Sequence, residues 1–546
     1  MQTLESTRSR SQSWLSWFFR GILVLALIIL LTRLSELQII KGAYYRDLAE
    51  NNRIKKIPII APRGKIYTSD GKLLADNQPQ KYFVDFDQEE GLVKTEVNDK
   101  DVPDSEVITE YNRVYPMGSL MAHLTGYLGE VNEDEVGKID EDCPGKGDRS
   151  LGSMIGRGGL EQYYDCKLRG ADGEQLIEVN TLGEKIRILG QRQPVPGMDI
   201  HTNIDSKLQS KVAEIVENRS GIDKKFLTDL GELKGAIVVS KPKGEIMSLY
   251  SFPAYDPANI ADYLTDEDLP LFNRAIGGAY HPGSIFKLVT AIGALEVGAI
   301  DTDYEYEDTG VINIDEYSYT NWYFTQYGGR EGLIGLKRAI ARSTDTYFYK
   351  VGELMGIDNL AHWAREFGLD KETGIDLPGE IHGLVPDPDW KKRVIGERWF
   401  LGNTYHVAIG QGDLTATPVE MNTLTNVFAN GGYLCEPRIN SDLEEKCIHL
   451  DISPDYIDEI VEGMKQVCSD GGTAYPFFGF IPQAACKTGT AETFENDKTH
   501  AWFTVMAPAD NPEIVVTVLI EKGGEGSQVA APLAFNILNW YFHENH

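Results

Sequence analysis

A serine and a lysine three residues apart form the first pair in this chain whose chemistry needs an explanation. The stretch HPGSIFKLVTA, from His281 to Ala291, places Ser284 and Lys287 at the start of a very apolar segment. Burying an ammonium group costs several kcal/mol unless the group is paired or neutralised. The lysine is therefore either incidental or part of the chemistry of a site.

The spacing gives this pair a reaction that it can perform. Helical side chains three apart share a face, so the Ser284 hydroxyl and the Lys287 amine can come within hydrogen-bonding reach. Pro282 and Gly283 supply a helix start, where unpaired backbone N–H groups can hold an oxyanion. Burial favours the neutral amine, which can take the serine proton. Alone the signal is weak, because average usage produces S-x-x-K by chance about once or twice in a chain of this size.

Two further motifs follow in order along the chain. ARSTDTYFYKVG contains Ser343 and Asp345 in a helical context, and ACKTGTAE contains the run from Lys487 to Thr490. The set S-x-x-K, S-x-[ND] and K-T-G, in this order, is the pattern of the serine acyltransferases that recognise penicillin. The order and spacing of the three motifs predict nucleophilic acyl transfer.

With these motifs the chain resembles the class B, monofunctional penicillin-binding proteins, which are D,D-transpeptidases of peptidoglycan synthesis. The likeness covers nearly the whole chain. Its landmarks are PRGKIYTSDGKLLADN, GRGGLEQYYDCKLRGADG, PVPGMDIHTNIDSKLQ, HPGSIFK, TGIDLPGE, IGQGDLTATPVEM and KTGTAE. STDTYFY, with Asp rather than Asn, and TGIDLPGE followed by WK are most similar to the elongation-type branch.

The resemblance implies a catalytic role for five residues. It makes Ser284 the acylated nucleophile and Lys287 its general base, and it implies that Ser343 relays a proton to the leaving amine. Asp345, where much of the family has Asn, would orient Lys287 or the substrate amide. Lys487 would hold a positive potential that helps to keep Lys287 neutral.

The third motif is expected to bind the substrate. The resemblance assigns the hydroxyls of Thr488 and Thr490, on either side of Gly489, to the substrate carboxylate. It assigns the backbone N–H groups of Ser284 and Thr490 to an oxyanion hole, in which each donor is worth about 3 kcal/mol in serine hydrolases.

The implied reaction cross-links stem peptides in cell wall synthesis and cell shape. Ser284 attacks the penultimate D-Ala and expels the terminal D-Ala, and an amine of a neighbouring stem resolves the acyl-enzyme. β-Lactams would acylate Ser284 and stall there. Two alternatives remain: a β-lactam sensor or hydrolase on the same fold, and a non-catalytic scaffold that activates a glycan polymerase. The scaffold is disfavoured because Ser284 and Lys287 are both present.

The elements that must position these motifs lie in the second half of the chain. Strands are predicted over GAIVVSKPKGEIMSLYS, HAWFTVMAP and PEIVVTVLIEK. A mostly helical insert from about residue 265 to 430 separates them, and an amphipathic helix from Ser527 to about Phe542 closes the chain. This order predicts an α+β domain over 231–546, with one antiparallel sheet covered by helices. By resemblance it is a transpeptidase domain of the penicillin-binding and serine β-lactamase-like type.

The segment 43–230 is predicted to be a strand-rich mixed pedestal, of the penicillin-binding protein dimerisation type by resemblance. Its features are a hairpin around Asp70-Gly71 and a helix from about Asp205 to Asn218. Nothing in it looks like a glycosyltransferase. Glycan polymerisation would therefore need a partner, and the resemblance implies a SEDS-type polymerase.

Residues 1–42 are predicted to form a cytoplasmic tail and a single transmembrane anchor. Trp14 to Leu31 is apolar apart from Ser16 and Arg20, and no cleavage site for a signal peptide follows. Basic residues lie on both sides of the span, so charge counting leaves its orientation open. The resemblance places the catalytic domain outside the bacterial cell (inner) membrane, where peptidoglycan lies.

Charge and cysteine content exclude other classes. With 52 basic and 83 acidic residues the net charge is −31, which argues against a nucleic-acid partner.

Six cysteines match no zinc spacing. Cys143 with Cys166, or Cys435 with Cys447, can pair in an oxidising compartment, and buried free thiols fit equally well. Cys486 is expected to be a small buried filler behind its strand. No cofactor is expected, and no metal, because Ile340 stands where the elongation branch sometimes has a cysteine ligand.

Overall fold

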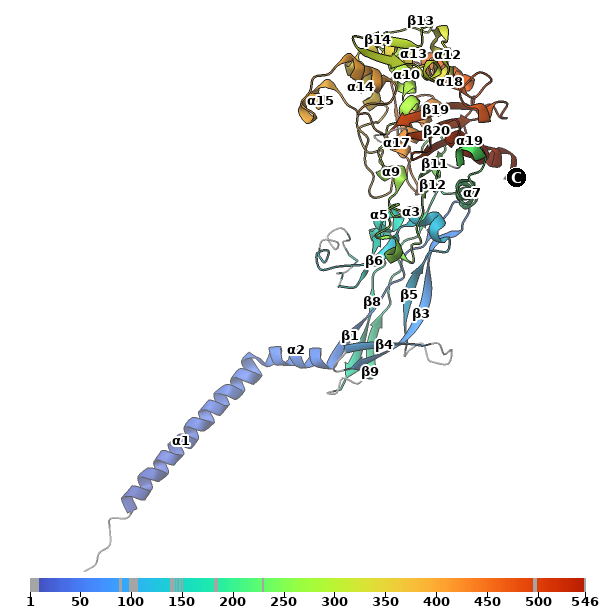
Figure 1. The fold of residues 1–546 in the computed structure, drawn as a ribbon. Helices are drawn as coiled ribbons and strands as arrows, with labels where there is room; N and C mark the ends of the chain where they lie inside the picture. The colour runs from blue at the N-terminus through green and yellow to red at the C-terminus, as the bar shows by residue number, and fades with distance from the viewer. Residues whose placement is uncertain are drawn as a thin grey trace, which may run out of the picture. The chain divides into compact units, whose positions relative to one another are not determined.

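The computed structural model describes residues 9–87, 91–97, 107–137, 143, 145–146, 149, 151–180, 185–227, 230–493 and 498–544 (Figure 1). The first eight residues of the predicted cytoplasmic tail lie outside this range. The chain forms two compact units that interleave along the sequence. The first contains residues 1–62, 78–112 and 170–196, and the second contains residues 63–77, 113–169 and 197–546. The domain limits at 42 and 230 stay a prediction.

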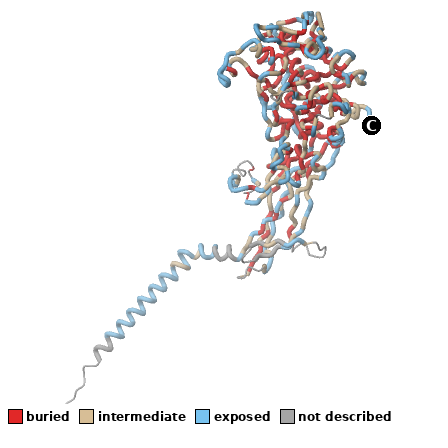
Figure 2. Tube along the Cα trace, viewed as in Figure 1, coloured by how far each residue is buried: buried red, intermediate tan, exposed pale blue. Residues whose placement is uncertain are grey.

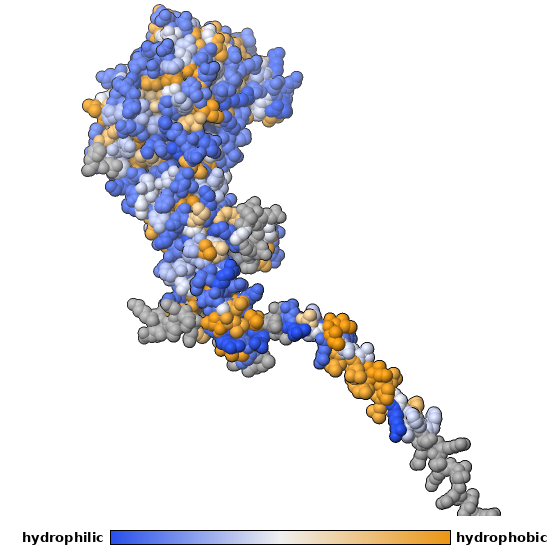
Figure 3. Space-filling model, turned by 180° about the vertical axis from the view of Figure 1, so that it is seen from behind, coloured by the Kyte–Doolittle hydropathy of each residue, from blue (hydrophilic) through white to orange (hydrophobic). Residues whose placement is uncertain are grey.

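The first unit begins with the membrane anchor. Helix α1 (Ser9–Ser35) continues through a π-helical turn, η1 (Glu36–Ile40), into α2 (Gly42–Arg53). The span from Trp14 to Ile40 contains an 18-residue window with a mean hydropathy of 2.3, none of which is buried (Figures 2 and 3). Its 27 residues have a helical length of about 40 Å, more than the hydrocarbon core of a bilayer requires. The predicted single-pass anchor agrees with this helix.

Two groups of strands complete the first unit. Strands β1 (Ile54–Ile59), β8 (Gly173–Val179) and β9 (Lys185–Arg192) form an antiparallel sheet in the order β1-β8-β9. Strands β4 (Gly91–Glu96) and β5 (Val107–Val114) both pair with β3 (Leu73–Asp87). A small core holds them together, made of Ile57, Ile59, Ile108, Ile177 and Val179.

The predicted hairpin and helix of the pedestal lie in the second unit. Strand β2 (Ile66–Tyr67) pairs with the start of β3 around the Asp70-Gly71 turn, and β10 (Ile200–His201) runs parallel to β2. Asp205 caps α7 (Ser206–Glu217) by accepting hydrogen bonds from two backbone N–H groups of its first turn. The other elements here are η2 (Gly118–Met121), α3 (Ala122–Thr125), β6 (Tyr127–Glu130), β7 (Met154–Arg157), α5 (Gly159–Tyr163), α6 (Asp165–Leu168) and α8 (Lys224–Leu227).

The centre of the second unit is one five-stranded antiparallel sheet in the order β12-β11-β21-β20-β19. The strands are β11 (Gly235–Ser240), β12 (Ile246–Phe252), β19 (Ala485–Glu492), β20 (Thr499–Ala507) and β21 (Ile514–Ile520). Helices α7 and α19 (Ala530–Asn539) pack on this sheet, and so does α17 (Pro418–Ala429) (Figure 1). The prediction of one antiparallel sheet covered by helices is confirmed. The closing helix begins three residues later than expected and ends in η6 (Trp540–Glu544).

The insert between β12 and β19 is mostly helical, as predicted, and carries short hairpins. Its elements before α17 are η3 (Ile260–Tyr263), α9 (Arg274–Gly277), η4 (Gly283–Ile285), α10 (Lys287–Glu296), β13 (Glu305–Asp308), β14 (Val311–Ile314), β15 (Tyr317–Thr320), α11 (Trp322–Tyr327), β16 (Gly332–Gly335), α12 (Leu336–Arg342), α13 (Asp345–Met355), α14 (Ile357–Glu366), α15 (Pro388–Val394) and α16 (Leu401–Ala408). After α17 follow β17 (Tyr433–Cys435), β18 (Cys447–His449), α18 (Pro454–Val467) and η5 (Tyr475–Phe477).

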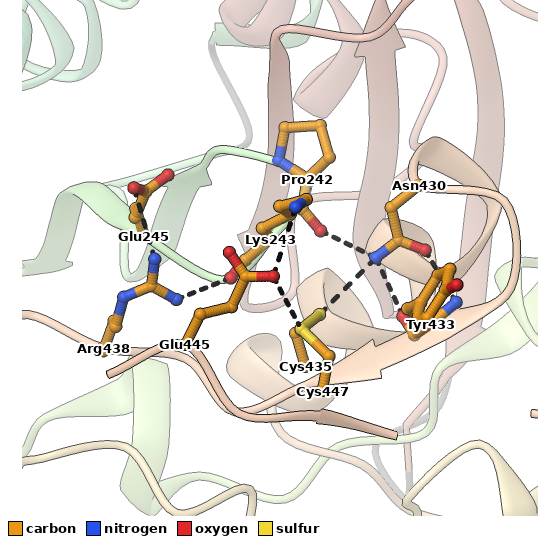
Figure 4. Close-up of a disulfide and its surroundings, with 9 residues drawn as sticks. All are labelled: Pro242, Lys243, Glu245, Asn430, Tyr433, Cys435, Arg438, Glu445 and Cys447. Atoms are coloured by element: carbon orange, nitrogen blue, oxygen red, sulfur yellow. Dashed lines mark hydrogen bonds and ion pairs between the residues drawn. A yellow bond between two sulfur atoms is a disulfide. The ribbon is translucent and has the colours of Figure 1, made fainter. Parts of the chain in front are cut away.

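All six cysteines form disulfides: Cys143–Cys166, Cys435–Cys447 and Cys468–Cys486. Cys435 and Cys447 are register partners in the β17–β18 hairpin, and Figure 4 shows Asn430 beside them, donating to the carbonyl of Pro242 at 2.9 Å. The expectation for Cys486 was wrong. Its side chain is buried as predicted, but it is bonded to Cys468 at the end of α18 rather than filling space as a thiol.

The N-terminus of α17 contains a buried carboxyl group. Thr417 and Glu420 form a reciprocal capping box in which the Thr417 N–H donates to Glu420 Oε2 at 2.6 Å. The N–H of Gly383 donates to Oε1 of the same carboxyl at 3.0 Å. Burial outweighs these hydrogen bonds and raises the pKa of Glu420 to about 7. The Glu420 carboxyl group therefore binds a proton more tightly in the folded protein than in the unfolded chain.

This shift makes the stability of the protein depend on pH. The stabilising contribution of Glu420 is fully present below the unfolded pKa and is lost as the pH rises through about 7. From pH 5 to pH 8, we expect the parent protein to lose about 2.5 kcal/mol in its free energy of unfolding relative to Glu420→Gln, which lacks this titration. Denaturant titrations at several pH values measure the difference. Glu444→Gln, at an exposed position, is the control and should leave the slope unchanged; an unchanged slope in Glu420→Gln would contradict the prediction.

Candidate active site

Ser284 lies on a tight turn that two glycines allow. The turn η4 contains Ser284, and α10 begins at Lys287. Gly283 has a φ of 57° and donates its N–H to the carbonyl of Gly410 at 2.9 Å. A Cβ on Gly410, whose φ is 79°, would lie 2.1 Å from the Gly283 carbonyl oxygen. The IGQG landmark therefore braces the serine turn through backbone contact that no larger residue permits.

Strand β19 packs against the other side of this turn. A Cβ on Gly489 would lie 3.1 Å from the Pro282 carbonyl, and a Cβ on Gly283 would lie 2.9 Å from the Thr490 carbonyl. Trp502 of β20 donates its indole N–H to the carbonyl of His281 at 2.9 Å. Gly489, which the resemblance assigned to substrate binding, thus has a packing role: it lets the K-T-G strand approach the serine turn.

The two lysines of the motifs meet at Ser343. Lys287 Nζ donates to Ser343 Oγ at 3.1 Å, to the Ser343 carbonyl at 2.8 Å and to Asp345 Oδ1 at 2.6 Å. Lys487 Nζ donates to Ser343 Oγ at 2.9 Å and to the Thr488 carbonyl at 2.9 Å. Both lysine side chains are fully buried. The structure thereby brings four residues from three separate motifs into one hydrogen-bonded network.

Ser343 adopts a backbone conformation that non-glycine residues seldom adopt. It sits between α12 and α13 with φ 55° and ψ 41°, in the left-handed region. This break directs its carbonyl and its hydroxyl to the same lysine. A serine continuing the helix would use its carbonyl within the helix, so the break at Ser343 is part of the site.

Burial lowers the pKa of both lysines of the site. Burial lowers the pKa of Lys287, although the carboxylate of Asp345 acts in the opposite direction. Burial, together with the neighbouring charge of Lys287, lowers the pKa of Lys487 well below its ordinary value. Two buried amines that donate to the same hydroxyl repel one another when both are protonated, so the doubly charged state is disfavoured. The site therefore favours a state in which at least one lysine is a neutral base.

Asp345 accepts on both of its oxygens. Oδ1 accepts from Lys287, and Oδ2 accepts from the backbone N–H of Trp322 at 3.2 Å. An asparagine would turn its NH₂ group toward one of these two donors. The carboxylate that this chain has where much of the family has Asn can accept from both donors at once.

Thr488 and Thr490, which the resemblance assigned to the substrate carboxylate, are held by side chains that sequence reasoning missed. Thr488 and Thr473 share a hydrogen bond of 2.8 Å between their hydroxyls. Thr490 Oγ1 donates to Glu525 Oε2 at 2.9 Å. Glu525 lies in the loop after β21, and its only signal in the sequence is an acidic residue in a glycine-rich stretch, GGEGS. Among the described residues, no three His, Cys, Asp or Glu side chains gather in a metal-binding arrangement.

Comparisons with known proteins agree with this geometry. The chain matches the family model of the penicillin binding protein transpeptidase domain over residues 235–539, and that of the penicillin-binding protein dimerisation domain over 84–202. The peptidoglycan D,D-transpeptidase MrdA of Haemophilus influenzae is 31% identical, over 96% of this chain and 91% of that protein.

Solved structures extend the likeness to the whole fold. Pseudomonas aeruginosa PBP2 in complex with WCK 5153 has a TM-score of 0.71 at 30% identity, covering 90% of this chain and 98% of that one. A structure of a peptidoglycan synthase complex that coordinates polymerization and crosslinking has a TM-score of 0.74 at 27% identity, covering 98% of this chain and 99% of that one.

Proposed function

Because the chain belongs to the class B penicillin-binding proteins of the elongation type, we propose that its peptidoglycan D,D-transpeptidase reaction runs through an acyl-enzyme on Ser284. The observation that carries this assignment is the pair of buried lysines that share Ser343 Oγ beside the serine turn. They supply a base and a proton relay, and both lysine side chains are fully buried.

The first step forms the acyl-enzyme. Ser284 Oγ attacks the carbonyl carbon of the penultimate D-Ala, and its proton moves to the neutral Lys287 Nζ. The resulting ammonium directs its new N–H back towards Ser284 Oγ and shares its other two N–H groups among the acceptors around it: the Ser343 carbonyl, Ser343 Oγ and Asp345 Oδ1. The network therefore matches the charged lysine that proton transfer creates, so it stabilises the transition state more than the ground state.

The second half of the step releases the terminal D-Ala. The C–N bond breaks, and the departing amine needs a proton. Ser343 Oγ accepts from both lysines, so its own O–H can point outward to the leaving nitrogen and be restored from Lys287. Deacylation reverses these transfers: a neutral acceptor amine attacks the ester, its proton leaves through Ser343, and Ser284 recovers its hydrogen.

Peptide mapping tests the assigned nucleophile directly. After incubation with benzylpenicillin and denaturation, trypsin should release the peptide from Ala275 to Lys287 with the mass of one added penicilloyl group. A donor stem pentapeptide should release D-Ala, and an added acceptor amine should raise product formation rather than hydrolysis alone. An adduct on any other peptide would refute Ser284 as the nucleophile. Rapid turnover of penicillin would instead favour the hydrolase alternative.

We also propose that the catalytic domain lies outside the cytoplasmic membrane. Three disulfides support this, because such bonds persist in oxidising compartments and are rare in the cytosol. The substrate lies on the same side. Protease added to intact spheroplasts should then degrade the C-terminal domain, and full protection would overturn this orientation.

A glycan polymerase of the SEDS type is the partner that we propose. The structural relative in a complex coordinating polymerization and crosslinking supports it. The anchor α1 and the first unit are the surfaces that we assign to this contact. Co-purification with the polymerase in detergent should fail when α1 is replaced by an unrelated membrane span.

A further inference from the structure

Glu525 accepts the hydrogen bond from Thr490 that the substrate carboxylate would need. Thr490 Oγ1 donates its single proton to Glu525 Oε2 at 2.9 Å and accepts from the N–H of Gly526 at 3.3 Å. A hydroxyl has one proton to give. In this arrangement Thr490 has no proton left for the terminal carboxylate of a donor peptide.

The position of this carboxylate is set by close packing. A Cβ on Gly526 would lie 2.2 Å from the Trp502 carbonyl and 2.3 Å from the Gly489 carbonyl. The loop therefore lies flat on β19 and β20, directly beside the K-T-G motif. Glu525 is half-buried there rather than extended into solvent, so its charge acts on the site at close range.

The second oxygen of Glu525 faces another element of the site. Gln326 Nε2, on α11, lies 3.5 Å from Glu525 Oε1. The same helix begins at Trp322, whose N–H is held by Asp345. Glu525 thus links strand β19 to α11 (Trp322–Tyr327), whose first N–H donates to Asp345.

We propose that Glu525 is a specificity-determining residue that competes with the donor's terminal carboxylate for the Thr490 hydroxyl. Binding of an anionic donor requires Glu525 to release Thr490 and places two carboxylates near one another. Glu525 therefore restrains acylation by anionic donors and by β-lactams, and favours donors whose other contacts are strong enough to displace it. This inference rests on the proposed role of Thr490 in binding the substrate carboxylate.

The test compares two thioester donors on the full chain in detergent. One is an N-acyl-D-alanyl thioester whose leaving group ends in a carboxylate, and the other ends in a carboxamide; thiol release gives kcat/KM for each. In Glu525→Gln, kcat/KM for the carboxylate donor should rise about three- to ten-fold relative to that for the carboxamide donor. Glu525→Ser should show the same direction, which guards against an effect peculiar to glutamine.

Glu492→Gln is the matched control. Glu492 lies on the same strand, two residues after Thr490, but is exposed, so removing its charge should change the ratio by less than two-fold. An unchanged or lowered ratio in both Glu525 variants would overturn the proposal, as would an equal change for the two donors. Failure of the proposed function looks different: thiol release would then persist in Ser284→Ala.

Discussion

Replacing Ser284 with alanine is expected to abolish covalent labelling by a fluorescent penicillin. The acyl-enzyme requires an oxygen on this residue to form the ester, and alanine has none. The measurement is the label retained after denaturation, with parent and variant at equal concentration. Label on the parent and none on the variant confirms the nucleophile.

The same variant should fold normally. Ser284 is only partly buried, and alanine is compatible with its turn, so the thermal midpoint should shift by no more than a few degrees. Label persisting on Ser284→Ala would exclude this serine. A folded parent that takes no label would favour the scaffold alternative and would make Asp345 the first residue to re-examine.

Replacing Lys287 with methionine should lower the rate of acylation by about 10³-fold or more, because the general base is removed while the apolar stem is kept. The measurement is the second-order rate constant for penicillin labelling, followed by time course. Lys287→Arg should be equally slow: arginine keeps the charge but cannot act as a base at neutral pH. This variant separates base catalysis from simple charge stabilisation.

Lys350→Met is the matched control for the lysine variants. Lys350 lies on α13, where it pairs with Glu353 at 3.0 Å and is partly exposed, so its loss should leave the labelling rate within about two-fold. A rate in Lys287→Met within ten-fold of the parent would contradict the assignment. It would transfer the role of base to Lys487, the other amine on Ser343.

Local patterns in the sequence predicted most of the fold. The hairpin signal around Asp70-Gly71 corresponds to an observed strand pair, and the strands predicted in GAIVVSKPKGEIMSLYS pair as β11 and β12. Both limits of α7 lie within one residue of the prediction, and Asp205 caps its N-terminus. The motifs predicted that Lys287, Ser343, Asp345 and Lys487 lie together, and the structure brings these four residues into one network; their catalytic roles stay a prediction.

The features that were missed depend on contacts between distant segments. Cys468 and Cys486 come together only because α18 packs on β19. Glu525 meets Thr490 because a loop 35 residues later folds back onto the strand. Neither contact has a local pattern. The left-handed break at Ser343 was hidden because the residues around it have ordinary helical composition.

The conformation of Ser343 sets stability and chemistry against each other. A left-handed serine costs about 1–2 kcal/mol, and glycine would adopt the same backbone at almost no steric cost. Glycine, however, would remove the hydroxyl on which both lysines converge. Losing this hydroxyl also leaves buried N–H groups without an acceptor, a cost similar to the backbone gain. A laboratory evolution that rewards only heat resistance would therefore let inactive Ser343→Gly variants persist. Screens for hardier variants of this enzyme need a catalytic readout in every round.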